Sequence, residues 1–514
     1  MFHAQVGLAL ALFSCTGASN FELRINASTG AFTIEVGHEV WLQSADITMI
    51  WDGKVRSTGD RSLALESPPS TTAGKDALGA YARYEFAWLL DDNHTAGVVF
   101  RTAFKTYDAA SAIVFEQSFP YGVDAFSVDP PAPPARWSWG EPGSGFPSFD
   151  TSGRNSRLGG SNALAFIAYG EIGMVKPPTR FPGIGSARYK ANTSGFEDGV
   201  PLTLFDETTG RAAVLSPLDS FFDLVCGLGA PSSSAPLPPL RCGVIGTARS
   251  VPRGFTASTI LYVGDAPSAT TGGRGRVSGA LMAWGALLLR WGAKQRAAPD
   301  STLQLSHLGY SSVGHYFYGV NINRTVAETL VDVAAGARAA GLPFAFPYYL
   351  VDSFWYGETD TAAPNGSVVP GFHGTWRWDD AIARRAHMAP EGLAALSRSL
   401  GDAVFVMHMG EWTGSDAAKF ASGAPPYASR TDWGWAVESA ASLPLGAGGA
   451  AFWDSLFANM SRVGLRVFKL DHSQQQAPDM QATSQVVGAT AEWLRDMAFA
   501  AERHGIAKQY GGHI

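Results

Sequence analysis

Two patterns of hydrophobic and polar residues divide this chain. From Phe21 to Val277, short segments alternate apolar and polar positions, for example FELRI (21–25), FTIEV (32–36) and YARYEFAWLL (81–90), and Gly, Pro, Asn and Asp separate them. Alternation with a period of two is typical of strands with one buried face. The pattern predicts an N-terminal β-sandwich domain over residues 20–277.

After Ser278 the pattern changes to apolar runs that alternate with helical segments. Residues 278–302 begin with SGALMAWGALLLRWGAKQR and predict a helical linker. Strands are predicted in LQLSHLGYSS (303–312), PFAFPYYLVDSFWY (343–356), AVFVMHMGEW (403–412), LRVFKLDH (465–472) and IAKQYGG (506–512), with helices over 325–341, 390–401, 451–464 and 487–505. Strands that alternate with helices indicate a parallel sheet.

The predicted fold class is therefore multidomain, β plus α/β. A TIM (β/α)8 barrel has eight strand–helix units. The chain supplies five strands before Ile514, and a sheet that ended there would leave an open edge. We expect residues 303–514 to be a partial barrel domain whose remaining part lies beyond Ile514.

The N-terminal residues predict a secretory route. Residues 1–19 carry an apolar core followed by small residues, as in a signal peptide, although a basic N-terminal region is missing. N-x-S/T glycosylation motifs begin at Asn26, Asn93, Asn192, Asn323, Asn365 and Asn459. We expect a secreted or lysosomal/vacuolar glycoprotein. In that setting Cys226 and Cys242 form a disulfide, or else remain two buried thiols.

Composition excludes some partners. The net charge of −7 is spread along the chain without a run of Lys or Arg, so nucleic acid is not an expected partner. No apolar run reaches the roughly 18 residues of a membrane span. The aromatic fraction of 12%, with 15 Trp, suits buried packing and also sugar-stacking surfaces.

Polar and aromatic residues gather where the predicted parallel strands end. Functional groups of βα folds lie at the carboxyl ends of strands. The residues at these ends are Tyr310, Asp352, Trp355, His408, Trp412, Lys469 and Asp471. Hydroxyl-binding groups beside flat aromatic rings predict a carbohydrate ligand.

Lys469 and Asp471 stand two residues apart in the fourth strand, so their side chains point to the same face. A lysine there would keep Asp471 ionised, as a nucleophilic carboxylate must be. The alternative is a structural ion pair at the end of the strand. The spacing alone does not decide between the two.

Three motifs together resemble those of a clan of retaining glycosidases that contains the α-galactosidases and raffinose-synthase-like enzymes. They are LVDSFWY (350–356), VMHMGEW (406–412) and FKLD (468–471). The resemblance implies an N-terminal sandwich followed by a barrel. It also implies that Asp471 is the nucleophile, that Lys469 and Asp352 bind sugar hydroxyls, and that Trp355 stacks on the ring. His408, Trp412 and Tyr310 are further predicted substrate-binding residues.

A retaining glycosidase needs two carboxyl groups about 5–5.5 Å apart. In the clan the acid/base carboxylate follows the fifth strand, so we expect it beyond Ile514, while Glu411, Asp352 and Glu358 are alternatives within the chain. The predicted function is hydrolysis of α-linked glycosides, α-galactosidase-like, by double displacement. The alternative is a catalytically inactive carbohydrate-binding protein on the same fold.

A metal-dependent hydrolase built on His408, Asp471 and His472 is a third hypothesis. No H-x-H or H-E-x-x-H spacing supports it. We therefore predict neither a metal nor another cofactor.

Overall fold

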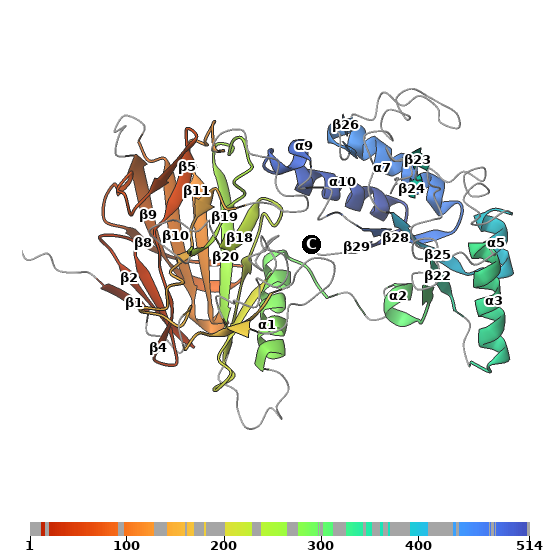
Figure 1. The fold of residues 1–514 in the computed structure, drawn as a ribbon, viewed down its shortest axis with the longest axis horizontal. Helices are drawn as coiled ribbons and strands as arrows, with labels where there is room; N and C mark the ends of the chain where they lie inside the picture. Colours follow the sequence, from red (N-terminus) through yellow and green to blue (C-terminus); the bar gives the residue numbers. More distant parts are fainter. Residues whose placement is uncertain are drawn as a thin grey trace, which may run out of the picture. The chain divides into compact units, whose positions relative to one another are not determined.

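The structure of the protein is a computed structural model, shown in Figure 1. It describes residues 12–15, 20–90, 97–127, 141–159, 162–168, 179–180, 201–228, 238–264, 276–296, 298, 302–311, 325–342, 346–351, 360–362, 368–370, 391–409, 435–437, 442–471, 473, 477 and 480–510. The chain forms two compact units, Met1–Arg296 with Ser484–Gly488, and Ala297–Thr483 with Ala489–Gly512.

The first unit is built from antiparallel sheets. The largest has the order β15-β14-β16-β17-β20-β11-β10-β9-β7, with β8 paired to β9. Its strands are β7 (Leu63–Leu65), β8 (Ser70–Asp76), β9 (Gly79–Leu90), β10 (Phe100–Tyr107), β11 (Ala112–Phe119), β14 (Ala165–Ala168), β15 (Thr179–Arg180), β16 (Leu202–Phe205), β17 (Ala212–Pro217) and β20 (Phe255–Val263), and the 3-10 turn η1 (Asp108–Ala110) joins β10 to β11.

Three smaller sheets complete this unit. Their orders are β1-β2-β3-β4, β12-β5-β6 and β13-β19-β18. The strands are β1 (Leu12–Cys15), β2 (Phe21–Asn26), β3 (Phe32–Val36), β4 (Glu39–Gln43), β5 (Thr48–Trp51), β6 (Lys54–Ser57), β12 (Ser144–Gly145), β13 (Ser148–Phe149), β18 (Leu224–Leu228) and β19 (Leu240–Val244). Burial alternates along β2 and β3, as the period-two pattern predicts.

An aromatic core joins the small β1–β4 sheet to the ten-stranded sheet. Phe32 on β3 packs against Phe104 on β10 at 5.0 Å and Phe115 on β11 at 5.7 Å between ring centroids. Phe146 and Phe149 contact the same ring. Each aromatic side chain buries a large apolar area, and edge-to-face contacts add to that gain. These rings lie between the two sheets and hold them face to face.

Helix α1 (Arg276–Trp291) belongs to this first unit. Its buried residues Ala280 and Leu287 contact the ten-stranded sheet, and Trp284 donates a hydrogen bond of 2.8 Å from Nε1 to Oγ of Ser216. Trp291 packs on the same cluster. The segment predicted as a linker (278–302) thus begins with a helix that covers one face of the sheet.

A disulfide joins Cys226 to Cys242, directly opposite each other on β18 and β19. This pairing confirms the first of the two alternatives for these cysteines. The glycosylation motifs at Asn93, Asn192, Asn323 and Asn365 lie outside the described residues.

The second unit contains a five-stranded parallel sheet in the order β21-β22-β25-β28-β29. The strands are β21 (Tyr310–Ser311), β22 (Tyr348–Val351), β25 (Val404–Met409), β28 (Leu465–Leu470) and β29 (Ala507–Tyr510). Two antiparallel pairs, β23 (Asp360–Ala362) with β24 (Val368–Pro370) and β26 (Trp435–Val437) with β27 (Ser442–Pro444), follow β22 and β25 in the chain. An antiparallel β part and a parallel α/β part confirm the multidomain fold class.

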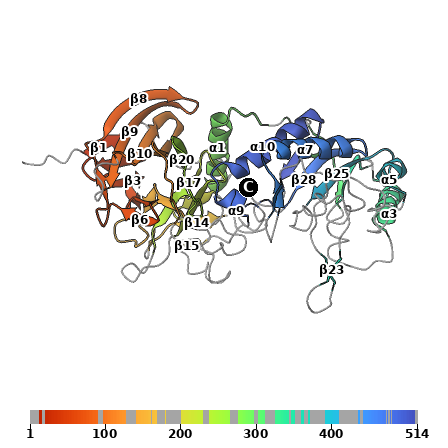
Figure 2. The same cartoon turned by 90° about the horizontal axis from the view of Figure 1, so that it is seen from above.

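Helices connect these strands, as the sequence predicts. They are α3 (Val326–Ala339), α5 (Leu393–Ser399), α7 (Gly446–Ser461), α9 (Gln481–Ser484) and α10 (Ala489–Arg503). Thr325 begins α3 through a capping box, because its hydroxyl accepts from the Glu328 amide and the Glu328 carboxylate accepts from the Thr325 amide. Helices α7 and α10 lie beside each other in Figures 1 and 2.

The strand predicted over 303–312 is largely wrong. Residues Leu303–Ser306 form the short helix α2, and β21 keeps only Tyr310 and Ser311. Apolar residues at positions 303 and 305 fit both a strand and one helical turn, and so short a run does not distinguish them. Among the described helices, none combines the length and the apolar content needed to cross a membrane.

Candidate active site

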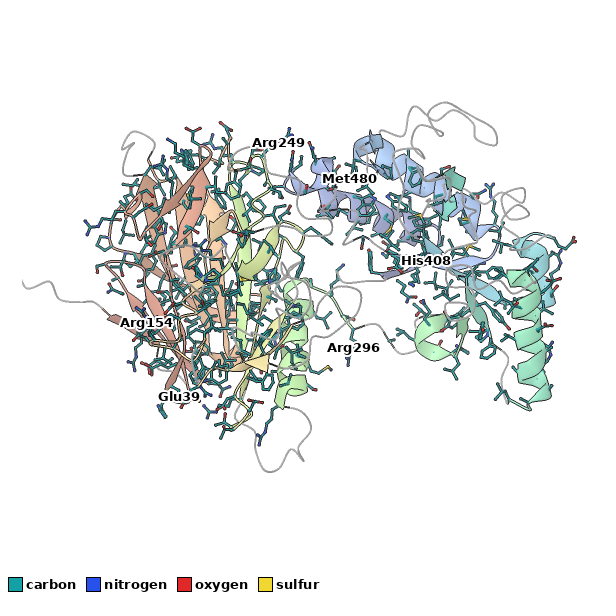
Figure 3. The ribbon with its side chains drawn as sticks, viewed as in Figure 1. Glu39, Arg154, Arg249, Arg296, His408 and Met480 are labelled. Carbon is teal, nitrogen blue, oxygen red and sulfur yellow. A yellow bond between two sulfur atoms is a disulfide. The ribbon has the colours of Figure 1, made fainter. Side chains whose placement is uncertain are left out.

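The site begins with the pairing of β25 and β28. These strands are parallel, and His408 lies directly opposite Lys469. Residues paired in this way point to the same face of the sheet. The Asp471 amide donates to the Met409 carbonyl at 2.8 Å, so pairing continues one residue past the end of β28. His408, Lys469 and Asp471 therefore share one face at the carboxyl ends of two neighbouring strands (Figure 3 labels His408).

The Asp471 carboxylate receives two nitrogen contacts at the same oxygen. His408 Nε2 lies 3.1 Å and Lys469 Nζ 3.2 Å from Oδ2. The His408 side chain is 2% exposed, while those of Lys469 and Asp471 are 15% and 21% exposed. The carboxylate is thus held by a buried donor on one strand and a partly buried cation on its own strand, and it remains accessible itself.

Packing on the other face of β28 fixes the strand. Phe468 lies against Trp453 and Phe457 of α7, with ring centroids 5.9 and 5.1 Å away. All three side chains are at most 1% exposed. Because neighbouring residues of a strand point to opposite faces, burial of Phe468 directs Lys469 toward the polar face. This alternation sets the position of both charged side chains.

Chemically, the arrangement suits a carboxylate that must stay ionised and hold one orientation. Charge-assisted hydrogen bonds are stronger and shorter than neutral ones. An ammonium and an imidazole N–H on one oxygen restrict rotation of the carboxyl group. Among the described residues, no group of three His, Cys, Asp or Glu side chains is arranged to hold a metal ion.

The structure brings together three of the predicted site residues, which are Asp471, Lys469 and His408. His408 Nε2 bonds to Asp471, and the expected contact of His408 with substrate stays a prediction. The pairing of these two residues depends on the register of β25 against β28, which the sequence of either strand does not contain. Asp352, Trp355 and Trp412 lie outside the described residues, as do Glu358, Glu411 and His472.

Tyr310 lies on the other face of the sheet. It pairs with Tyr349, which in turn pairs with Phe405. Phe405 is three residues before His408 on β25, so the side chains of this row point to the face opposite that of His408. Its ring packs against Phe346 and Tyr349 at 6.0 and 6.3 Å, and burial raises the pKa of its hydroxyl. The register thus turns the Tyr310 side chain away from Asp471, and its expected contact with substrate stays a prediction.

Comparisons with known proteins identify the fold. No protein-family model and no curated protein matches the chain. Among solved structures, the ligand-free alpha-N-acetylgalactosaminidase NagBb from Bifidobacterium bifidum aligns with a TM-score of 0.53 at 12% sequence identity, over 97% of this chain and 77% of that chain. The chain has the fold of this alpha-N-acetylgalactosaminidase.

Two further solved structures are similar to this chain. NagBb in its GalNAc complex gives a TM-score of 0.52 at 12% identity, over 97% of this chain and 76% of that one. The alpha-galactosidase from Lactobacillus brevis gives 0.49 at 11% identity, over 99% and 70%. At 12% identity the likeness to NagBb establishes the fold, and the chemistry has to be inferred from the site itself.

Proposed function

We propose that this protein is a retaining glycoside hydrolase that acts on α-linked sugars of the galactose type, with Asp471 as its nucleophile. The observation that carries the proposal is the position of Asp471. It stands at the carboxyl end of a parallel strand, accessible, with Oδ2 held by Lys469 and His408. Nucleophilic carboxylates of retaining glycosidases need this combination of ionisation, orientation and access.

In the proposed mechanism, the Asp471 carboxylate attacks the anomeric carbon from the face opposite the leaving group. A carbon–oxygen bond to Asp471 forms while the glycosidic bond breaks, and a second carboxylic acid protonates the departing oxygen. Water, deprotonated by that second group, then attacks the anomeric carbon and releases Asp471. Two inversions retain the α configuration. No described residue is assigned to the acid/base role.

We also propose that the parallel sheet is part of a (β/α)8 barrel. The support is the placement of α7 and α10 on one face of the sheet. Phe468 contacts α7, and Lys508 on β29 donates to the Ala498 carbonyl in α10, both from the face opposite Lys469. Helices of a barrel lie outside the strands, so the face with Asp471 becomes the interior and its rim.

The alternative is a carbohydrate-binding protein on the same fold that no longer cleaves its ligand. The two functions differ in whether Asp471 reacts with the sugar. A hydrolase forms a covalent bond between Asp471 and the sugar, whereas a binding protein holds the sugar without reaction.

Covalent trapping tests the proposal. A 5-fluoro-α-galactosyl fluoride carries a leaving group that departs without a proton, so attack by the nucleophile is measured whether or not an acid/base group takes part. The adduct is located by peptide mass spectrometry. We expect it on Asp471, and Asp471→Asn removes it. Asp402→Asn, the same chemical change at an exposed turn before β25, is the matched control and should label normally.

An adduct on any other residue would reject Asp471 as nucleophile. A wild-type protein that binds galactose or N-acetylgalactosamine but forms no adduct would support the binding-protein alternative. Initial rates on nitrophenyl α-galactoside and α-N-acetylgalactosaminide then establish which sugar is preferred.

A further inference from the structure

A third polar side chain continues the row formed by His408 and Lys469. Strand β29 pairs with β28 in parallel, and Gln509 lies directly opposite Lys469. His408, Lys469 and Gln509 therefore occupy equivalent positions on three neighbouring strands and share one face. Strands of a sheet are about 4.8 Å apart, so Gln509 stands one strand spacing from Lys469, on the side away from His408.

Lys508 and Tyr510 of β29 lie on the opposite face. Lys508 donates to the Ala498 carbonyl in α10, and Tyr510 pairs with Leu470, whose side chain belongs to the face of Phe468. Ala507 lies on the same face as Gln509 but has no polar atom in its side chain. Gln509 is thus the polar side chain that β29 presents to the site.

A hydrogen bond orients the Gln509 amide. Gln304 in α2 donates from Nε2 to Oε1 of Gln509 at 2.6 Å. A primary amide has one acceptor oxygen and two N–H donors. With its oxygen bonded to Gln304, Gln509 presents its N–H donors to whatever occupies the polar face. Gln509 is half-buried.

We propose that Gln509 is a substrate-positioning residue that donates a hydrogen bond to a hydroxyl oxygen of the sugar bound at Asp471. This inference rests on the proposed function. A pyranose carries one hydroxyl at C2, next to the anomeric carbon, and others at C3, C4 and C6 farther round the ring, which spans about one strand spacing. With Asp471 at the anomeric carbon, Lys469 and Gln509 reach hydroxyls from adjacent strands. Gln304 acts through Gln509 by fixing its amide.

The test pairs removal of the amide with removal of single hydroxyls from the substrate. Turnover of α-galactosyl fluoride and of its 2-, 3-, 4- and 6-deoxy analogues is measured for the wild type, Gln509→Ala and Gln304→Ala. Gln509→Ala should lower kcat/KM about threefold to tenfold on the parent sugar, as expected for loss of one neutral hydrogen bond. On the deoxy analogue that lacks the bound hydroxyl, Gln509→Ala and the wild type should have the same kcat/KM.

Controls separate positioning from folding. Lys508→Ala, one residue away on the opposite face, should leave all five rates unchanged. Gln509→Asn, which keeps a shorter amide, should recover part of the activity. Gln304→Ala should reproduce the selectivity of Gln509→Ala at smaller amplitude, because the amide remains but turns more freely. A loss that is equal on all five sugars would mean that Gln509 supports the fold only and would overturn the inference.

Failure of this inference and failure of the proposed function give different results. If Asp471→Asn abolishes turnover while Gln509→Ala shows no hydroxyl-selective loss, the inference is wrong and the nucleophile stands. If Asp471→Asn turns over normally, the proposed function is wrong and the inference falls with it. If the wild type binds these sugars without turnover, the same comparison is made on dissociation constants, where a uniform effect again overturns it.

Discussion

His408 and Asp471 are joined by a hydrogen bond of 3.1 Å that crosses from strand β25 to strand β28. The histidine is almost fully buried and the carboxylate is not. A buried donor therefore fixes one oxygen of a carboxylate that is accessible to solvent. Lys469 reaches the same oxygen from within β28, so two independent elements determine one orientation.

Loss of either donor should impair catalysis through the same oxygen. Lys469→Met and His408→Gln are each expected to lower kcat/KM about tenfold to a hundredfold, as for hydrogen bonds to a charged group. Because both donors act on Oδ2, the double variant should lose less than the product of the two single losses. Steady-state rates on α-galactosyl fluoride measure this, with urea unfolding of each variant to correct for stability. Fully multiplicative losses would show that the two donors act independently.

Strands β22, β25, β28 and β29 of the second unit follow from the sequence because their apolar runs are long enough to be distinctive. LRVFKLDH predicts both β28 and the shared face of Lys469 and Asp471, since alternation is a local property. Contacts between strands are not local. The His408–Asp471 bond and the position of Gln509 opposite Lys469 depend on register, which includes a shift between Phe405 and Val406. A single sequence gives no measure of that register.

The segment after β28 also makes long-range contacts that the sequence does not predict. Ser484–Gly488 follows the strand of Asp471 in the chain and belongs to the first unit, where the Thr247 hydroxyl donates to the Ser484 carbonyl and the Arg249 amide to the Gln485 carbonyl. These contacts join residues more than two hundred positions apart. Local pattern has no information on such pairs, and the sequence predicts only a helix start there.

Asp223 should make stability depend on pH. Its carboxylate is 5% exposed and accepts a 2.8 Å hydrogen bond from the Gly488 amide. Burial raises its pKa from the usual 3.8 to about 6, against the opposing effect of that bond. Between about pH 4 and pH 6 the folded state binds more protons than the unfolded state, so the free energy of unfolding falls as pH rises, by up to about 3 kcal/mol.

Asp223→Asn keeps an oxygen acceptor for Gly488 and removes the ionisation. We expect a flatter dependence of stability on pH between 4 and 6, and a higher free energy of unfolding at pH 7. Urea unfolding at pH 4, 5, 6 and 7 provides the comparison, with Asp108→Asn on an exposed turn as the control. Parallel pH profiles for Asp223→Asn and the wild type would show that Asp223 does not titrate in this range.

The disulfide should stabilise the first unit by restricting the conformations that its unfolded chain can adopt. Cys226 and Cys242 are separated by 16 positions, and a loop of that size corresponds to about 3 kcal/mol. The free energy of unfolding of the double variant Cys226→Ala/Cys242→Ala is expected to be lower by that amount. Its unfolding midpoint should therefore lie at a lower urea concentration. A reducing agent should lower the midpoint of the wild type and leave the double variant unchanged. Equal midpoints for the oxidised wild type and the variant would assign the disulfide no role in stability.

A buried ion pair between Arg157 and Asp206 should stabilise the first unit at neutral pH. Arg157 Nη1 lies 3.1 Å from Oδ2 of Asp206, and a second contact of 2.7 Å reaches Glu39. Asp206 is 4% exposed. Burial opposes its ionisation, but hydrogen bonds from Arg157 and Thr209 outweigh that effect and hold its pKa well below the usual range. Asp206 therefore stabilises the fold above about pH 4, and this contribution is lost as pH falls.

Arg157→Met leaves the buried carboxylate without its cation and should lower the free energy of unfolding at pH 7 by about 3–5 kcal/mol. Without Arg157, burial is opposed by the Thr208 and Thr209 hydrogen bonds alone, so the pKa of Asp206 rises and the variant should lose less stability than the wild type as pH falls. Adding Asp206→Asn removes the charge, keeps an acceptor for Thr209, and should restore part of the stability. Arg154→Met, at an exposed position labelled in Figure 3, is the control and should change stability little. A loss as small as that of Arg154→Met would mean that water reaches Asp206 and replaces the guanidinium.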